Sequence, residues 1–70
     1  MSRYTAAEAL DIARAYWPGA HVFVGYREGR YTVGFANEEG SIAEEYRGDT
    51  FNEALSIAEP HRFPLAEWLA

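Results

Sequence analysis

The stretch that most constrains the fold runs from Gly48 to Leu55, GDTFNEAL in one-letter code. It is typical of a strand end, a turn and a helix that a capping box opens. In such a box the Thr50 hydroxyl accepts from the amide of Glu53, and the Glu53 carboxylate accepts from the amide of Thr50. A chain that passes so quickly from a strand into a capped helix indicates a mixed α and β domain.

A second capping box, Thr5 to Glu8, opens a helix near the start of the sequence. Hydrophobic residues recur behind it at helical spacing, and Pro18-Gly19 ends the helix. They are Ala6, Ala9, Leu10, Ala13, Tyr16 and Trp17. The helix after Thr50 has a stripe of the same kind, formed by Phe51, Ala54, Leu55 and Ala58. Pro60 follows that stripe and ends the second helix.

Between the two helices the hydrophobic period changes to two, which indicates strands. One run covers residues 21–27 and the next 30–36, and Glu28-Gly29 between them is a two-residue hairpin turn. This turn sets a register in which three hydrophobic pairs share one face of the sheet. The pairs are Tyr26 with Tyr31, Val24 with Val33, and Val22 with Phe35.

A third strand is expected over residues 41–47, after the Asn-Glu-Glu-Gly turn. Two registers are open: a four-residue loop pairs Phe35 with Ile42, and a two-residue turn pairs Phe35 with Glu44. Because Glu44 then falls on the hydrophobic face, we expect this strand to be an edge with its acid reaching solvent. The residues that both registers place on the hydrophobic face are Ile42, Glu44 and Tyr46.

The expected architecture is α+β, in the order α-β-β-β-α, within a single domain of 70 residues. The strands form a three-stranded antiparallel meander, and both helices lie on one face of it. Pro64 can open a short extra helical turn at the C-terminal end. Residues 60–70 pack either on this domain or on a neighbour, because Phe63, Trp68 and Leu69 need cover.

The sheet face away from the helices is expected to be nearly bare in its middle, where glycines lie beside Phe23. Three arginines gather at one end of this face. Glycine in a strand often marks the close approach of another backbone or a ligand. The face is therefore either a solvated surface without a role or a secondary docking surface for a second copy or a partner. The residues that define it are Phe23, Arg27, Arg30, Gly34 and Arg47.

The residues for catalysis or metal binding are sparse. The absence of cysteine excludes disulfides and thiolate metal sites. His21 and His61 lie forty residues apart, and no serine has the context of a nucleophile elbow. We expect no enzymatic activity, no cofactor and no metal. No hydrophobic run approaches the roughly 20 residues of a membrane span, and the first residues do not resemble a signal peptide, so a cytoplasmic protein is expected.

The negative charge is concentrated in one window of the sequence. Residues 38–53 hold six acids and one arginine, a sum of −6 + 1 = −5 that equals the net charge of the whole chain. The expected fold makes the second turn, the third strand and the start of the second helix contiguous. The window is either a solvated face or a docking surface for a protein partner with a basic surface. Its acids are Glu38, Glu39, Glu44, Glu45, Asp49 and Glu53.

The order α-β-β-β-α resembles that of the double-stranded-RNA-binding domain. Proteins of that family present lysines at the start of the second helix to reach phosphates. This chain has Asp49, Thr50, Asn52 and Glu53 there, which would repel a phosphate backbone. We therefore expect no direct binding of nucleic acid.

The segments Tyr31 to Phe35 and Gly48 to Leu55 resemble the strand and helix start of HicB-type antitoxins. This resemblance covers under half of the chain, lacks the family's Pro-Gly-rich segment, and implies a module that neutralises a toxin. As a class, a compact acidic domain of 70 residues without an active site is similar to phage-encoded anti-CRISPR proteins. That similarity implies an inhibitor that covers a basic nucleic-acid-binding surface of a host defence complex. We expect a non-enzymatic binding domain of this inhibitor type, with an antitoxin-like module or a self-assembling structural domain as alternatives.

Overall fold

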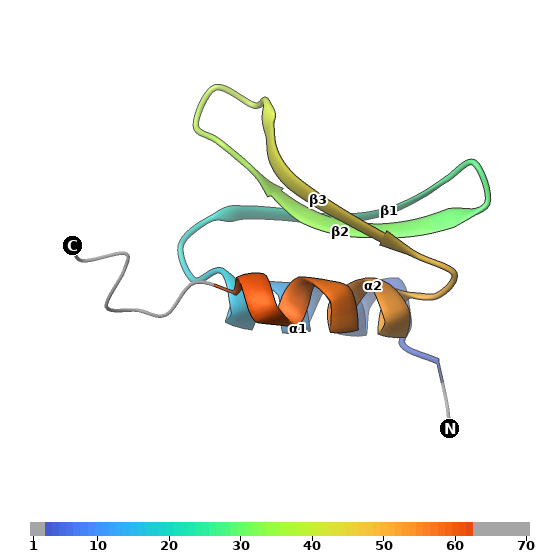
Figure 1. Ribbon diagram of the computed structural model, residues 1–70. Coiled ribbons are helices and arrows are strands. Elements are labelled where there is room, and N and C mark those ends of the chain that lie inside the picture. The colour runs from blue at the N-terminus through green and yellow to red at the C-terminus, as the bar shows by residue number, and fades with distance from the viewer. Residues whose placement is uncertain (1–2, 63–70) are drawn as a thin grey trace.

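The computed structural model describes residues 3–62 and confirms the α-β-β-β-α order. The three strands form one antiparallel sheet in the order β1-β2-β3, and both helices lie beneath the same face of it (Figure 1). A short 3-10 helix, η1, extends the second α-helix through Pro60. The elements are α1 (Ala6–Tyr16), β1 (His21–Arg27), β2 (Arg30–Ala36), β3 (Ile42–Gly48), α2 (Phe51–Ala58) and η1 (Glu59–His61). The expected helical turn at Pro64, and the side chains of Phe63, Trp68 and Leu69, lie outside the described residues.

The two helix starts use related but different hydrogen bonds. The capping box of α1 is complete, because Thr5 Oγ1 accepts from the N–H of Glu8 at 3.2 Å and Glu8 Oε1 accepts from the N–H of Thr5 at 2.9 Å. In α2 the Thr50 hydroxyl accepts from Glu53 as expected, at 3.0 Å. The Glu53 carboxylate, however, accepts from the N–H of Asp49 at 3.3 Å, so that half of the expected box is wrong. The φ angle is −145° at Thr50 and −77° at Thr5, so the two cap amides point in different directions.

The first hairpin has the expected register. Val22 pairs with Phe35, and the turn residues Glu28 and Gly29 both have positive φ, 53° and 81°. This is the geometry of the tight hairpin turns whose twist matches that of the strands.

The second hairpin contains a β-bulge that the sequence did not indicate. Phe35 pairs with Glu44, which confirms the second of the two registers, but Ala36 pairs with Ile42 and leaves Ala43 as an extra residue. The bulge places Ile42 on the face of Ala36 rather than on that of Phe35, because paired residues share a face. Ile42 is 56% exposed, and its expected place on the hydrophobic face is wrong.

The core lies between the sheet and the two helices, around the fully buried Trp17. The helices run in the same direction (Figure 1). The N–H of Tyr4 donates to Asn52 Oδ1 at 2.8 Å beside their N-terminal ends, and Trp17 Nε1 donates to the carbonyl oxygen of His61 at 3.2 Å beside their C-terminal ends. The buried hydrophobic residues are Ala9, Ala13, Trp17, Val33, Phe35, Phe51, Ala54, Leu55 and Ala58.

Candidate functional site

The acids of the charged window follow the β3 side of the molecule. Glu38 and Glu39 lie in the β2–β3 loop, Glu44 and Glu45 in β3, and Asp49 and Glu53 at the start of α2. Because β3 is an edge strand, these residues form one flank from the loop to the helix start. We call this surface the acidic flank and define it by the same residues: Glu38, Glu39, Glu44, Glu45, Asp49 and Glu53.

Glu45 differs from the other acids of the flank. Its register partner is Gly34, so it lies on the sheet face away from the helices, which we call the open face. Its side chain is 17% exposed. Arg47 Nη2 and Nε donate to Glu45 Oε1 at 2.8 and 3.1 Å. The pair neutralises the Glu45 carboxylate, and Glu45 therefore contributes little to the field of the flank.

Asp49 and Glu53 are exposed and also help to start α2. The Glu53 carboxylate accepts from the N–H of Asp49, in the first turn of the helix. Negative charge at a helix N-terminus is stabilised by the helix dipole. Changing either acid would therefore disturb the helix as well as the surface.

Glu44 lies beside an aromatic column. Tyr46 is stacked between Trp17 and His61, with ring centroids 5.9 and 5.2 Å away. Burial and, to a smaller degree, the negative charge of Glu44 raise the pKa of the Tyr46 hydroxyl above its usual range. Glu44 itself is exposed, as expected for an acid on an edge strand. Its charge is therefore directed to solvent at the middle of the flank.

The centre of the open face is covered by a side chain and is not bare, contrary to expectation. A Cβ added at Gly34 would clash with the carbonyl oxygen of Glu44 and would come within 2.9 Å of Phe23 Cζ. The Phe23 ring therefore covers its cross-strand partner Gly34, and Thr32 beside them is only 4% exposed. Gly34 is needed for the packing of the strands and is not an accessible docking position.

The structure brings the three arginines of the open face together. Arg27, Arg30 and Arg47 line a hollow of ≈ 380 Å³ with Glu28 at the end of the first hairpin. Arg27 and Arg30 are direct cross-strand partners, an arrangement of like charges that destabilises a hairpin. Neither of them takes part in an ion pair within residues 3–62. Two guanidinium groups without an ion-pair partner in this range thus lie at this end of the sheet, with Glu28 beside them.

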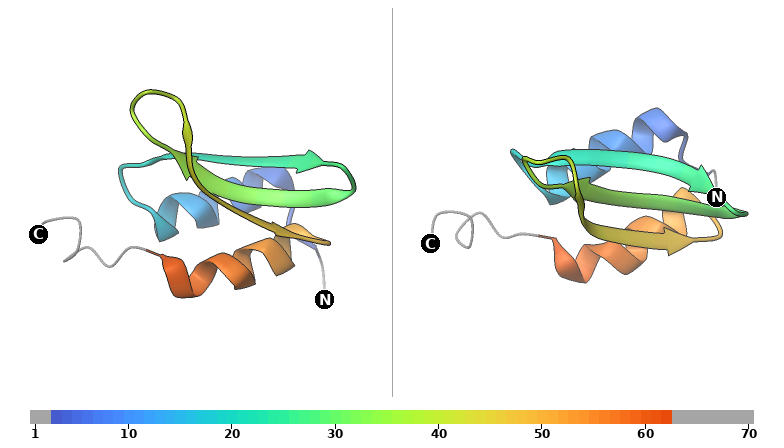
Figure 2. Two further views of the ribbon diagram at one scale, coloured as in Figure 1. Left: turned by 45° about the horizontal axis from the view of Figure 1, so that its top comes forward. Right: turned by 90° about the horizontal axis from the view of Figure 1, so that it is seen from above.

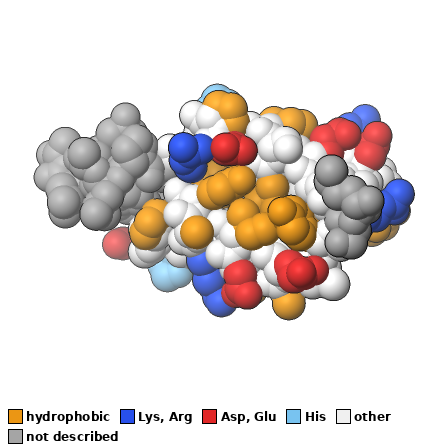
Figure 3. All heavy atoms as spheres, turned by 90° about the horizontal axis from the view of Figure 1, so that it is seen from below, with side chains coloured by type: hydrophobic (Ala, Val, Ile, Leu, Met, Phe, Trp, Pro, Cys, Tyr) orange, Lys and Arg blue, Asp and Glu red, His pale blue; other side chains and the backbone are white. Residues whose placement is uncertain are grey.

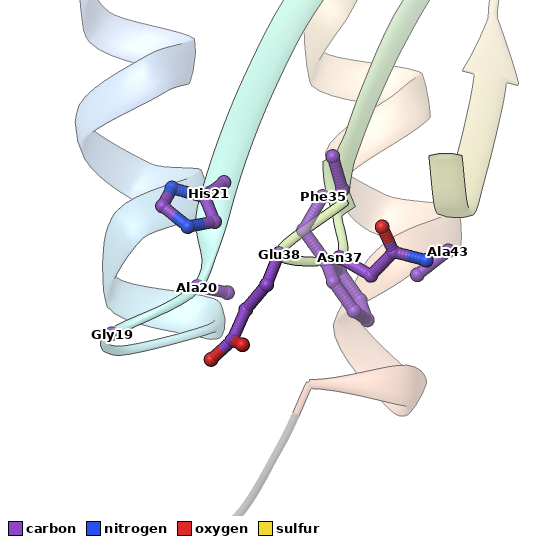
Figure 4. A pocket seen from close by; sticks show the side chains of 8 residues that line it. Gly19, Ala20, His21, Phe35, Asn37, Glu38 and Ala43 are labelled. Atoms are coloured by element: carbon purple, nitrogen blue, oxygen red, sulfur yellow. The ribbon is translucent and has the colours of Figure 1, made fainter. Parts of the chain in front are cut away.

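A second hollow, of ≈ 290 Å³, lies at the opposite end of the sheet. Figure 4 shows that the α1–β1 connection, the start of β1 and the β2–β3 loop all reach it. His21 and Glu38, seventeen positions apart in the sequence, both line it. Sequence reasoning missed this hollow; its lining includes Ala43, the extra residue of the unpredicted bulge. The full lining is Gly19, Ala20, His21, Phe35, Ala36, Asn37, Glu38 and Ala43.

The outer face of the helices carries a hydrophobic strip between charged borders (Figure 3). Tyr4, whose N–H donates to Asn52 at the start of α2, is 40% exposed. The charged side chains of the helices include two exposed pairs, Arg14 with Asp11 at 3.8 Å and Arg62 with Glu59 at 3.3 Å. Exposed pairs of this kind stabilise a protein by at most about 1 kcal/mol.

Within residues 3–62 the structure contains no group of three histidine or acidic side chains that could hold a metal ion. No helix in the same range is long and apolar enough to cross a membrane. The features that a function can be argued from are the charged surfaces and the open face of the sheet.

Comparison with known proteins gives no match to a family model, to a curated protein or to a solved structure. A function for this chain therefore has to be argued from its own surfaces.

Proposed function

We propose that this protein is a non-enzymatic binding domain that docks its acidic flank onto a basic surface of a protein partner. The observation that carries the proposal is the state of Glu38, Glu39 and Glu44. All three are exposed, and none takes part in an ion pair within residues 3–62. Asp49 and Glu53 extend the flank to the start of α2. Complementary charge of this kind speeds encounter and selects partners.

The sharpest form of the proposal is an inhibitor of the anti-CRISPR type. Such an inhibitor would cover a basic surface that its target uses for nucleic acid, and it needs size, rigidity and negative charge but no catalytic residues. The flank supplies the negative charge, because its acids are spread over a loop, a strand and a helix start along one edge of the sheet. The cytoplasm of the host would be the site of action.

An antitoxin-like module is the second candidate, supported by the strand-to-capped-helix segment that ends in α2. A gene for a small basic toxin beside the gene of this chain would favour it. A neighbouring cluster of phage structural genes would favour the inhibitor.

The test reverses the charge of two acids of the flank that take no part in the helix start or, within residues 3–62, in an ion pair. The fold is then disturbed as little as possible. Glu39→Lys with Glu44→Lys changes the flank without touching the helix start or the Glu45–Arg47 pair. The matched control is Asp11→Lys with Glu59→Lys, which makes the same change in net charge on the helices. Partners recovered from the source organism with the unmodified chain are then bound to each variant at low and high salt.

The flank variant should lose at least about tenfold in affinity at low salt, and the control should stay near the unmodified chain. High salt should narrow the difference, because it screens exposed charges. Equal affinity of the two folded variants would remove the acidic flank from the proposed function.

A further inference from the structure

The two edge strands of the sheet differ in the features that prevent pairing with a further strand. Figure 2 shows β1 and β3 on the two sides of β2. The β3 edge carries the bulge at Ala43 and the charges of Glu44, Glu45 and Arg47, all of which discourage pairing with another strand. The β1 edge has no such feature: residues 22–26 are uncharged, contain no proline and pair with β2 without a bulge. An edge of this kind is a template for a further strand.

Along this edge the backbone of β1 has no neighbouring strand within residues 3–62. In a hairpin with a two-residue turn, Arg27 and Arg30 form the hydrogen-bonded pair next to the turn. Alternation then directs the N–H and C=O groups of Val24 and Tyr26 away from β2. The N–H of Val22 is already bound to the carbonyl oxygen of Ala20 at 3.1 Å. Val24 and Tyr26 are therefore the positions at which a new strand would add.

A hydrophobic side chain lies beneath the same edge. Leu10 is partly exposed and is not among the side chains that pack on the core. Tyr16 lies on the side of α1 that faces α2. Its pKa is raised mainly by burial and, to a smaller degree, by the charge of Glu59, which follows α2 directly. At about 100° per residue, Leu10 lies on the side of Ala9 and Ala13 away from Tyr16, and we infer that this is the β1 side because α1 packs mainly on β1. A strand added to β1 would cover Leu10.

We propose that β1 pairs antiparallel with β1 of a second copy, which joins the two sheets into one of six strands. Pairing centred on Val24 engages the whole of β1. It sets Val24 opposite Val24, and the N–H of Tyr26 donates to the carbonyl oxygen of Val22 of the second copy, whose own N–H stays bound to Ala20. It sets Phe23 opposite Gly25 of the second copy, so the large Phe23 side chain faces a residue that has no side chain. It also sets Val22 opposite Tyr26. A two-fold axis through Val24 makes the contact self-complementary and closed.

Charge complementarity supports a second copy as the occupant of the edge. Antiparallel pairing brings the hairpin end of one copy next to the end of the other that holds His21. Arg27 and Arg30 lie at the first end and take part in no ion pair within residues 3–62. Glu38 lies beside His21 at the second end (Figure 4). The two-fold axis creates this opposite-charge contact twice.

The pairing shares Glu38 with the acidic flank but does not use the other acids of the flank. It leaves β3 as the outer edge on both sides of the joined sheet. Glu39 and Glu44, the positions reversed in the binding test above, lie away from the Val24 axis. The two proposals can therefore fail separately.

Sedimentation and light scattering of the full chain, from micromolar to millimolar concentration, test the proposal. We expect a species of twice the 7.9 kDa chain mass. Val24→Pro removes the edge N–H but no bond to β2, and proline is tolerated at such edge positions. The matched control Val24→Ala keeps the N–H. Val24→Pro should raise the dissociation constant of the dimer at least about tenfold relative to Val24→Ala.

A charge swap provides a test that does not depend on the proline. Arg27→Glu should weaken the dimer, and Arg27→Glu combined with Glu38→Arg should restore it, since the pair is rebuilt with its signs exchanged. A monomer at every concentration would overturn the proposal. So would a dimer that Val24→Pro and Arg27→Glu both leave unchanged, because another surface would then hold it.

Discussion

Trp17 Nε1 and the carbonyl oxygen of His61 are joined by a hydrogen bond of 3.2 Å that links the end of α1 to η1. The Tyr46 ring of β3 stacks on both residues, at 5.9 Å from the Trp17 ring and 5.2 Å from the His61 ring. The fully buried Trp17 indole therefore connects the end of α1, the 3-10 helix η1 and the edge strand β3.

Trp17→Phe should lower the free energy of unfolding by about 2–3 kcal/mol, because it removes this hydrogen bond and leaves a void in the core. Urea denaturation followed by circular dichroism measures the loss. The control His61→Ala keeps the carbonyl acceptor and removes an exposed ring together with its stacking on Tyr46, so it should cost only about 1 kcal/mol. Equal losses for the two variants would contradict the role given to the indole.

Gly34→Ala should destabilise the fold by about 3 kcal/mol or more, because the new methyl group has no room between the Glu44 carbonyl and Phe23. Gly25→Ala on the same face is the matched control. There the added Cβ would meet only Thr32 Oγ1, at 3.3 Å. Thermal melts should show a large decrease in melting temperature for Gly34→Ala and a small one for Gly25→Ala. Similar melting temperatures would show that the strands can separate to admit a side chain.

Glu28→Asn should raise the free energy of unfolding by about 0.5–1 kcal/mol, because Glu28 holds a φ of 53° that asparagine adopts more readily. No other non-glycine residue within residues 3–62 has a positive φ. Glu39→Asn in the second loop is therefore the control, with the same change of side chain but no relief of strain. Urea midpoints compare the two, and a gain confined to Glu39→Asn would contradict the turn geometry.

Stability should fall at alkaline pH through Tyr16 and Tyr46. Burial raises the pKa of each hydroxyl above the ordinary value of 10.0, with smaller contributions from Glu59 at Tyr16 and from Glu44 at Tyr46. A raised pKa means that folding favours the neutral phenol. The contribution is therefore complete below the unfolded pKa and is lost as pH rises through the folded one.

The pH dependence is measured by urea denaturation across the alkaline range, with phenolate absorbance as the titration signal. Tyr16→Phe and Tyr46→Phe should each flatten the decrease in stability above pH 10. An unchanged slope in the double variant would assign the decrease to other groups.

Ile42→Thr should change the free energy of unfolding by no more than about 0.5 kcal/mol, because the bulge directs this side chain to the exposed face. Val33→Ala, in the fully buried middle of β2, should cost about 2 kcal/mol. A large loss for Ile42→Thr would mean that the side chain packs in the core, as the regular register had predicted.

Local signals in the sequence predicted most of the fold. The Thr5 cap, the Glu28-Gly29 turn and the alternation around Val24 each involve residues close in the chain. Their geometry follows from hydrogen bonds and backbone preferences that a single sequence contains. The first hairpin register and the order of the elements were therefore confirmed.

The parts that sequence reasoning missed depend on contacts between separate strands. The bulge at Ala43 follows from how the loop closes, with Asn37 Oδ1 accepting from Glu39 and Ser41, each at 3.0 Å. The Glu45–Arg47 pair and the Phe23 ring over Gly34 then follow from which side chains the sheet brings to one face. Spacing alone could name these residues but could not show which of them were paired or covered.

Because α1 and α2 run in the same direction, the contacts between the two helices join the two ends of the described chain. The bonds that join them link residues 48 and 44 positions apart, whereas the strands pair with their immediate neighbours in sequence. Closing so long a segment costs entropy that short hairpins avoid. We expect the meander to assemble early and the helices to dock late, so that core substitutions on α1 accelerate unfolding more than they slow folding.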